Sequence, residues 1–323
     1  MLVQERAATV VIVTKNRRDE LRDSVRSAVE QTGKPDVLVL DDGSNDGSSE
    51  MVEREFPAAR VVRYDRSEGY IVRRNQAARL ARTPIIVSID DDATFSTPDT
   101  VTQVLGEFDD ERIGAVAMPY INVRCDDIIR KRAPGALGGY ATNGFIGTAY
   151  AVRRDVFLGL GGFSELFFHQ GEEREFCTRM LAAGFVTALG RSDPVHHAVS
   201  PRRDLRRIHV FARRNDILCA WLTTPMPYLP VHIAGTVTKG AAFGLRMSRV
   251  RWMATGVLAG LGGCLRHWAA RRPVSIAAYR LSRELAKRQS MPIEAVFEKI
   301  APHGGRAVDG TAGRRAARNR KAA

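Results

Sequence analysis

The sequence predicts an α/β protein with a mostly parallel sheet, helices on both faces of that sheet, and a helical, basic C-terminal section. Two observations lead to this prediction. Between residues 8 and 118, short apolar runs rich in β-branched residues alternate with amphipathic stretches, and such runs are typical of strands buried on both faces. From about residue 203 the pattern becomes helical. Alternation of strand and helix implies right-handed crossovers between parallel strands.

The expected elements follow one another in a regular order. The first helix is expected after Asn16, which would be its N-cap. Residues 120–140 are polar and basic, which favours a mobile, irregular segment over the site. Ligands of such sheets bind beyond the carboxyl ends of the strands. Strands are expected at 8–14, 37–40, 60–64, 85–89, 113–118 and 145–152, and further helices at about 51–56, 73–81 and 174–183.

Composition excludes several classes of protein. A chain of 323 residues that is 44% hydrophobic can bury a sizeable core, and its 26% of charged residues describe neither a disordered nor a fibrous protein. The four cysteines form no CxxC pair, which excludes a disulfide scaffold and a structural zinc cluster and favours a reducing cytosol. No signal peptide is expected before the first apolar run, because that stretch is short and carries both signs of charge.

Charge divides the chain into unlike parts. The formal net charge is +13, yet residues 1–202 contain slightly more acidic than basic residues. A uniformly basic nucleic-acid-binding protein would not show this division, and the basic part matches anionic lipid, nucleic acid or a phosphorylated ligand. We therefore expect an α/β domain at 1–202, a helical region at 203–303, and a disordered basic tail at 304–323, which is rich in Gly, Ala and Arg.

Three consecutive aspartates, Asp90, Asp91 and Asp92, follow the expected strand at 85–89. Carboxylates this close repel one another unless a cation neutralises them. A carboxylate cluster with few His or Cys residues nearby suits Mg²⁺ or Mn²⁺, which prefer oxygen ligands and leave positions open for phosphate. The alternative is a solvated acidic turn, but a buried strand that brings the acids to the sheet edge argues against it.

Three further segments carry candidate site residues. The stretch DDGSNDG at 41–47 can accept hydrogen bonds from a base or a ribose, or is an ordinary turn rich in Asx residues. The stretch GYIVRRN at 69–75 opens a helix with two arginines, which could hold a diphosphate or be surface residues. Glu172, Glu173 and Glu175 enter a helix after a glycine, either as a general base or as acids favoured by the helix dipole.

Other features narrow the choice of chemistry. The adjacent histidines His196 and His197 would point to opposite faces of an extended segment, so at most one is expected in a site. The sequence has no GxGxxG after the first strand, no GxxxxGK[ST], no HExxH and no GxSxG. These absences disfavour a Rossmann dinucleotide site, a P-loop, a zinc protease and an α/β-hydrolase.

Five segments follow one another between roughly residues 8 and 200: VVIVTKNRRDEL, VLVLDDGSNDGS, GYIVRRNQA, IIVSIDDDATF and GGFSELFFHQGEEREF. Each motif alone is modest, whereas all five in this order and at these intervals are specific. Together they resemble a family 2 glycosyltransferase with the GT-A fold. The resemblance implies a nucleoside-diphosphate sugar as donor and an inverting transfer.

Position by position, the resemblance assigns donor-binding roles. Thr14 and Asp42 would contact the nucleoside base, and Arg74 would lie near it. Asp90 would contact the ribose, and Asp91 would lie between this residue and the metal ligand that follows.

The resemblance also assigns a metal site and a base. Asp92 would coordinate Mg²⁺ or Mn²⁺, which would bridge the diphosphate. The family often has a histidine near this cation, and His197 is preferred to His196 for that place. The family's base usually lies in a Glu-Asp pair. In this chain the pair is Glu172–Glu173, so Glu173 takes the position of the base, with Glu172 as the alternative.

The implied function is that of a hexosyltransferase in cell-envelope polysaccharide, glycolipid or natural-product glycosylation. Its expected partners are the sugar donor and an acceptor glycan, lipid-linked glycan or small molecule, with no nucleic acid. The alternative is a peripheral, basic nucleotide- or RNA-binding protein without transferase activity. The intact acidic clusters disfavour that alternative.

The C-terminal section raises the question of a membrane. Residues 217–238 lack charged side chains over the length of a membrane span, but Pro225, Pro227 and Pro230 disfavour one continuous helix. Residues 252–265 are apolar, too short to span, and flanked by arginines. That layout suits an interfacial helix on anionic lipid, and packing on the catalytic domain is the alternative. The expected location is the cytoplasm, or the periphery of the membrane at its inner face.

Overall fold

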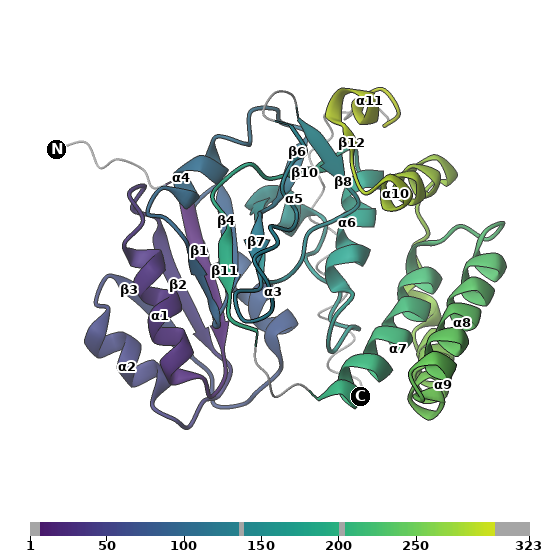
Figure 1. Cartoon of the computed structure of the whole chain (residues 1–323), viewed down its shortest axis with the longest axis horizontal. Coiled ribbons are helices and arrows are strands. Elements are labelled where there is room, and N and C mark those ends of the chain that lie inside the picture. The colour runs from purple at the N-terminus through teal and green to yellow at the C-terminus, as the bar shows by residue number, and fades with distance from the viewer. Residues whose placement is uncertain (1–6, 136–138, 200–203, 301–323) are drawn as a thin grey trace.

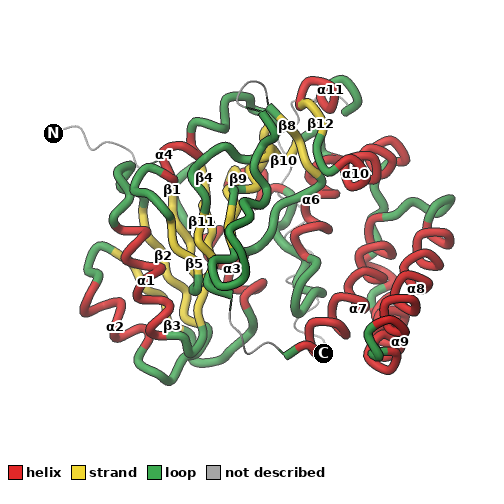
Figure 2. Tube along the Cα trace, viewed as in Figure 1, coloured by secondary structure: helices red, strands yellow, loops and turns green. Residues whose placement is uncertain are grey.

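The computed structural model describes residues 7–135, 139–199 and 204–300. Within them a nine-stranded sheet carries helices on both faces, and a group of C-terminal helices stands beside it (Figures 1 and 2). The order of the strands is β12-β8-β10-β6-β9-β4-β1-β2-β3. This confirms the predicted α/β class. The tail expected at 304–323 lies outside the described residues.

The part of the sheet that contains β4, β1, β2 and β3 is parallel, and the part on the other side of β4 is mixed. Strands β4, β1, β2 and β3 run parallel, whereas β9 enters antiparallel between β4 and β6. The strands are β1 (Ala8–Thr14), β2 (Asp36–Asp41), β3 (Ala59–Arg63), β4 (Ile85–Asp90), β6 (Ile113–Ala117), β8 (Tyr140–Thr142), β9 (Ala149–Arg153), β10 (Val186–Leu189) and β12 (Met291–Pro292).

Helices cover the sheet because its strands are apolar on both faces. In β1, Val10 and Ile12 face one core together with Leu21 of α1, whereas Val11 faces the opposite core together with Ile71 of α3. The helices of this part are α1 (Arg18–Val29), α2 (Ser48–Glu55), α3 (Tyr70–Leu80), α4 (Thr100–Leu105), α5 (Arg154–Gly159) and α6 (Glu172–Ala182).

Several helix starts differ from the prediction, and those of α1 and α3 bear on the site. Helix α1 has Arg17 as its N-cap, not Asn16. Asn16 instead adopts a positive φ of 53°, and its side-chain oxygen accepts a hydrogen bond from the backbone N–H of Asn45 at 2.8 Å. Asn16 therefore joins the β1–α1 loop to the β2–α2 loop. Helix α3 begins at Tyr70, one turn before the expected start at residue 73.

A small second sheet lies at the carboxyl end of β4. It consists of β5 (Ala93–Phe95), β11 (Val195–His197) and β7 (Tyr120–Ile121), in the order β5-β11-β7. β5 follows β4 almost directly, and β11 pairs with β5 so that His197 lies opposite Ala93. The small sheet thus brings His197 to the end of β4. The segment at 120–140, expected to be irregular, contributes strands at both of its ends.

The C-terminal section has two parts. Helices α7 (Leu205–Thr223), α8 (Leu229–Arg246) and α9 (Val250–Arg266) pack on one another, and the prolines at 225 and 227 lie between α7 and α8, as expected. A single 3-10 turn (Trp268–Ala270) follows. None of the helices among the described residues is long and apolar enough to cross a bilayer.

The second part returns to the sheet. Helix α10 (Ile276–Arg288), β12 and α11 (Ile293–Phe297) follow one another, and β12 pairs with β8 at the sheet edge. Leu281, Leu285 and Val296 belong to the same buried core as β1 and α1. The last part of the predicted 203–303 region therefore shares a core with the α/β domain.

Candidate active site

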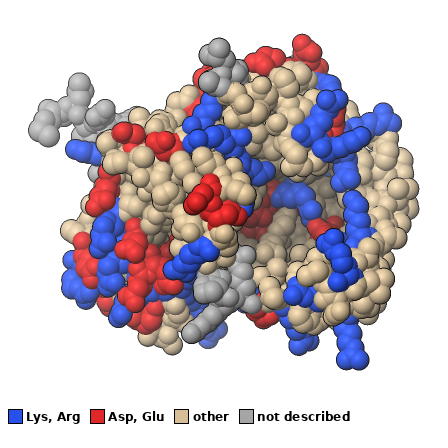
Figure 3. Space-filling view, in the orientation of Figure 1, with Lys and Arg blue, Asp and Glu red and all other residues tan. Residues whose placement is uncertain are grey.

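A cavity of about 1110 Å³ opens at the carboxyl ends of β1 and β4. In Figure 3 the molecular surface is hollowed near its centre, and acidic side chains lie in the hollow. The cavity brings together residues that are far apart in the sequence. Among the predicted site residues, those that line it are Thr14, Asp42, Arg74, Asp90, Asp91, Asp92, Glu173 and His197, whereas Glu172 does not.

Asp90, Asp92 and His197 form a candidate cation site. One ligand atom from each lies within 4.8 Å of the others. Burial alone would raise the pKa of Asp92, but its hydrogen bond to His197 and the positive charge of Arg17 outweigh burial and hold that pKa below its usual value. Asp92 is therefore an anion at neutral pH, as a metal ligand must be.

Asn122 orients the ring of His197. The Nδ1 atom of His197 lies 2.9 Å from Oδ1 of Asn122, and an amide oxygen only accepts hydrogen bonds. Nδ1 is therefore the atom that donates to Asn122, and Nε2 lies 3.4 Å from Oδ1 of Asp92. Asn122 thus fixes the ring so that Nε2 faces Asp92, the arrangement that second-shell partners give to histidine ligands of metals.

Asp91 is held away from this cluster. It accepts a hydrogen bond from the Thr14 hydroxyl at 2.9 Å and one from Arg17 at 3.0 Å. Burial raises the pKa of Asp91 to about 7, the positive charge of Arg17 opposes that rise, and the charges of Asp90 and Asp92 reinforce it. Arg17 also contacts Asp92 at 3.0 Å, so one guanidinium balances two of the three carboxylates.

Asp42 organises the loop that precedes α3. Its two carboxylate oxygens accept hydrogen bonds from the Ser67 hydroxyl, the N–H groups of Glu68 and Gly69, and Nε of Arg73, at 2.5 to 2.9 Å. Arg73 is almost completely buried and stacks on the Tyr64 ring. Arg73 rather than Arg74 is thus the arginine beside Asp42.

Arg74 lines the cavity between Asp90 and Gly147. Its Nη2 donates to Asp90 Oδ1 at 2.6 Å and to the Gly147 carbonyl at 2.9 Å. The Thr148 hydroxyl donates to the other oxygen of Asp90 at 2.8 Å. A Cβ on Gly147 would lie 2.5 Å from Nη1 of Arg74 and 2.9 Å from Oε1 of Glu173, so a larger residue here would displace both side chains. The structure thereby ties Arg74 to the residue that the resemblance assigns to the ribose.

The two glutamates at the start of α6 have unlike surroundings. Glu173 lines the cavity, and its Oε1 accepts a hydrogen bond from the Gly147 N–H at 2.9 Å. Glu172 is fully buried, 3.7 Å from Arg74. Burial and then the charge of Glu173 raise the pKa of Glu172 to about 8, against the opposing charge of Arg74. Burial therefore favours the protonated form of Glu172.

Sequence reasoning missed several residues that shape this site. Arg17 could have been found, because it follows the first strand at the edge where the aspartates lie. Asn122 and Gly147 lie between short strands, where the sequence has no periodic pattern to align them with the site. Their places depend on pairing between β7 and β11 and on the antiparallel entry of β9.

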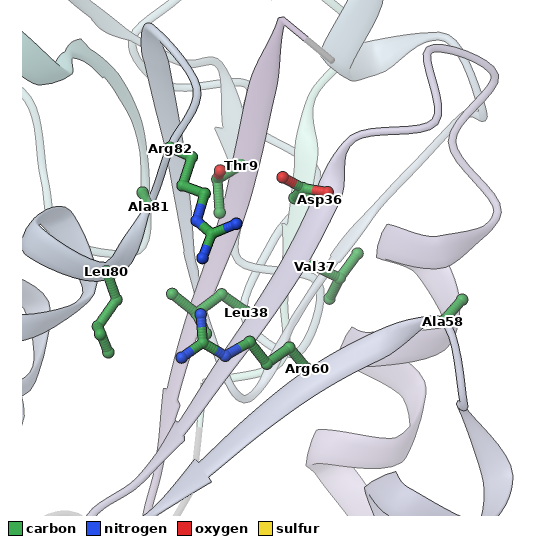
Figure 4. Close-up of a pocket in the computed structure, with 9 residues that line it drawn as sticks. All are labelled: Thr9, Asp36, Val37, Leu38, Ala58, Arg60, Leu80, Ala81 and Arg82. Atoms are coloured by element: carbon green, nitrogen blue, oxygen red, sulfur yellow. The ribbon is translucent and has the colours of Figure 1, made fainter. Parts of the chain in front are cut away.

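A second cavity, of about 380 Å³, lies at the opposite, amino-terminal ends of β1 and β2. Figure 4 shows Arg60 and Arg82 in it, with Asp36 and Thr9 nearby. No cluster of acids with a histidine lines this cavity. The chemistry that the sequence predicts is gathered at the larger cavity.

Two curated proteins are similar in sequence to part of this chain. The chain is 24% identical over 195 residues to the O-antigen chain rhamnosyltransferase WbaN of Salmonella anatum, covering 55% of this chain and 62% of that protein. It is 30% identical over 101 residues to the succinoglycan biosynthesis protein ExoU of Rhizobium meliloti (strain 1021), covering 30% of this chain and 29% of that protein. The chain thus spans less than two thirds of the length of both relatives.

Solved structures share the fold. The mannosyltransferase PcManGT from Pyrobaculum calidifontis, in complex with GDP-Man and Mn²⁺, has a TM-score of 0.57 at 21% identity, over 87% of this chain and 80% of that one. The S. aureus TarS 1-349 structure has a TM-score of 0.55 at 14% identity, over 87% of this chain and 91% of that one. These similarities confirm the predicted GT-A fold.

The sheet, the acidic cavity at its carboxyl edge and these neighbours define a protein of the GT-A fold. The sequence profile described as Glycosyl transferase family 2 matches residues 9–177, more than half of the chain. The chain belongs to this family.

Proposed function

We propose that this protein transfers a hexose from a nucleoside-diphosphate sugar to an acceptor hydroxyl, with inversion and with dependence on Mg²⁺ or Mn²⁺. One observation carries the proposal. Glu173, a candidate base, and the Asp90–Asp92–His197 cluster, a candidate cation site, line the same cavity of about 1110 Å³. A cavity of this size takes a nucleotide sugar and leaves room for an acceptor.

The donor is assigned to the side of the cavity formed by β1, β2 and α3. Thr14, Asp42, Asp91 and Arg74 line it there. Asp42 already accepts four hydrogen bonds within the protein, which supports a role in shaping the wall as well as in contacting the base. The proposed roles of Thr14 and Asp42 at the base, and of Asp90 at the ribose, rest on the resemblance.

The residues present fit a divalent cation. Two carboxylates and an imidazole whose other nitrogen is held by Asn122 make a donor set suited to Mn²⁺, and to Mg²⁺ with added water. Asp92 and His197, together with Asp90, would hold the ion. When bound, it supplies Lewis-acid stabilisation of the charge on the departing diphosphate. Mn²⁺ accompanies the nucleotide sugar in the PcManGT structure, which supports this part of the proposal.

Glu173 is the proposed base. Its carboxylate reaches the cavity, and the hydrogen bond that Oε1 accepts from the Gly147 N–H fixes its position there. Glu172 is fully buried, and its burial favours the protonated form, which cannot accept a further proton as a base. In the proposed reaction Glu173 takes the proton of the acceptor hydroxyl, whose oxygen attacks the anomeric carbon from the face opposite the diphosphate. No covalent intermediate with the enzyme is required, so the anomeric configuration inverts.

The class of acceptor follows from the relatives. The two curated relatives are named for O-antigen and succinoglycan synthesis, which supports an envelope glycan or a lipid-linked glycan over a free small molecule. Such an acceptor would place the enzyme in the cytoplasm at the inner face of the membrane.

A donor panel tests the proposal. The protein is incubated with UDP-, dTDP- and GDP-sugars and Mn²⁺, and release of the nucleoside diphosphate is measured. We expect slow hydrolysis of one donor, abolished by EDTA. With an acceptor, the anomeric coupling in the NMR spectrum of the product should show inversion. Binding of RNA without hydrolysis of any donor would support the non-enzymatic alternative.

The adjacent glutamates provide a matched pair of variants. Glu173→Gln should bind the donor normally by calorimetry and lose turnover on the order of 100- to 10,000-fold, because the amide cannot take a proton. Glu172→Gln should retain most turnover, because Gln resembles the protonated acid. The reverse result would make Glu172 the base.

A further inference from the structure

Helices α8 and α9 expose large apolar side chains to solvent. Leu245 of α8, Leu258 and Leu265 of α9, and Trp268 just beyond it are 70–79% exposed, and so is Val231 near the start of α8. Leu258 and Leu265 are seven residues apart, and Val231 and Leu245 fourteen, so each pair lies on one side of its helix. Exposed apolar side chains that gather on one side of an element can mark a docking surface, unlike single scattered ones. We call these five residues the outer apolar face.

Small residues occupy the inner sides of the same helices. Gly256 and Gly260 of α9 pack against α7, where an added Cβ would lie 2.7 Å from the carbonyl oxygen of Val210 and 2.9 Å from Cβ of Ile217. Gly244 of α8 packs against α9 in the same way. In a helix pair stabilised by water exclusion, large apolar residues face inward. On α9 the buried positions are Met253, Gly256, Gly260 and Cys264, whereas Leu258 and Leu265 face outward. These outward apolar side chains are therefore free to contact a surface outside the protein.

The charges around this face have one sign. No acidic residue occurs between Asp216 and Glu284, a stretch that contains both helices. Lys239, Arg246, Arg251 and Arg266 are exposed on α8 and α9, and Figure 3 shows basic side chains over the C-terminal helices. An apolar stripe flanked only by cations is the pattern of a helix lying in the interface of an anionic bilayer.

We infer that the outer apolar face docks on an anionic lipid surface, with α8 and α9 lying along the membrane. Two other occupants fit less well. A second copy pairing face to face would bring equal positive charges together. Residues 301–323 contain Arg and Lys but no Leu, Ile, Phe, Met or Trp, so this segment has little apolar surface with which to cover the face.

Helix α7 connects the docking surface to the active site. Arg207 and Ile208, near its start, line the large cavity, and farther along α7 packs against α9 through the glycines. A membrane bound by α8 and α9 would therefore lie at a fixed distance and orientation relative to the cavity. The docking itself does not depend on the proposed function, but with it this geometry favours a lipid-linked acceptor.

Vesicle flotation of the full chain tests the inference. We expect flotation with phosphatidylcholine vesicles that contain phosphatidylglycerol, loss of most of it at high salt because charges are screened, and little with phosphatidylcholine alone. The double variant Leu258→Ser, Leu265→Ser should lower partitioning by at least about tenfold, because two exposed leucines no longer enter the lipid. Ile128→Ser, which changes a residue that is 61% exposed on another segment, is the matched control and should float normally.

A second pair of variants separates charge from apolar contact. Arg251→Gln with Arg266→Gln should weaken binding to anionic vesicles at low salt and leave thermal unfolding unchanged. Equal flotation with neutral and anionic vesicles, or none with either, would overturn the inference. So would a dimer in light scattering that dissociates in the Leu258→Ser, Leu265→Ser variant, since a second copy would then cover the face. Donor hydrolysis by these variants reports on the proposed function separately.

Discussion

Each of the three consecutive aspartates has its own partners, which explains how the protein tolerates them. Asp90 is held by Arg74 and Thr148, whereas Asp91 is held by Thr14 and Arg17. Asp92 contacts His197 and shares Arg17. Each carboxylate thus has a different set of partners. Of the three, Asp90 and Asp92 are the ones that lie close enough to His197 to share a cation with it.

Asp92→Ala should lower the affinity for Mn²⁺ and for the Mn²⁺-dependent donor by at least about tenfold, because it removes an anionic ligand. The fold should remain, since the change also relieves repulsion among the acids. Calorimetry with Mn²⁺ and donor measures both affinities, and His196→Ala is the control on the adjacent side chain outside the cluster. Unchanged affinity in Asp92→Ala would refute the metal role.

The buried Glu172 predicts how stability varies with pH. Its pKa is raised from 4.5 to about 8, so the folded protein binds this proton more tightly than the unfolded chain. The contribution is present in full below the unfolded pKa and is lost as pH rises through the folded pKa. Relative to Glu172→Gln, the wild type should therefore lose melting temperature between about pH 4.5 and 8. A constant difference across this range would contradict the burial of a protonated acid.

At the scale of elements, one buried ion pair connects β2 to α3. Asp42 follows the end of β2 and accepts from Arg73 within α3 at 2.6 Å, with both side chains nearly inaccessible. Because α3 also carries Arg74, this pair fixes a helix that reaches into the active site.

Asp42→Ala should destabilise the fold by about 3–5 kcal/mol, since it leaves the Arg73 guanidinium buried without its carboxylate. Urea unfolding monitored by circular dichroism measures the change. Asp65→Ala, at an exposed position in the same loop region, should change stability by less than about 0.5 kcal/mol. If Asp42→Ala loses donor affinity without losing stability, the residue acts on the donor and not on the loop.

Strands buried on both faces could be predicted from the sequence, because such strands, for example 8–14 and 85–89, are continuous runs of apolar residues. The first residues of the helices were harder to predict. Asn16 is a favoured N-cap residue, but its side chain is engaged by Asn45 across the loops, and no local pattern reports such a contact. The five motifs contain the predicted site acids that line the large cavity, and Arg17 lies within the first of them, whereas the place of Asn122 became apparent only from the pairing of β7 with β11.

At the scale of the whole molecule, a strand from the C-terminal section, β12, forms one edge of the large sheet. β12 has only two residues, and the residues of β8 with which they pair lie 150 and 152 positions earlier in the chain. The Thr142–Gln289 hydrogen bond lies next to this pairing. A strand this short carries no sequence signal of its own, so the return of the chain to the sheet could not be predicted.

Leu285→Ala should destabilise the whole α/β domain by about 2–5 kcal/mol, because Leu285 is 1% exposed in the core shared with β1. Circular dichroism and tryptophan fluorescence should report one coincident transition. Leu258→Ala, at an exposed leucine of α9, is the control and should have little effect. Two separate transitions would mean that the C-terminal part unfolds independently.

Because β12 lies near the C-terminal end of the described chain, it joins the sheet late during protein synthesis. The ribosome delivers α8 and α9 before β12, so the nascent chain passes through a stage in which the leucine-rich helices are complete while the edge of β8 still lacks its neighbour. Unpaired strand edges and exposed apolar surface both promote aggregation. Anionic lipid present at that stage would shield one of the two hazards. We therefore expect cell-free translation with phosphatidylglycerol vesicles to yield less aggregated protein than translation with neutral vesicles, as measured by centrifugation.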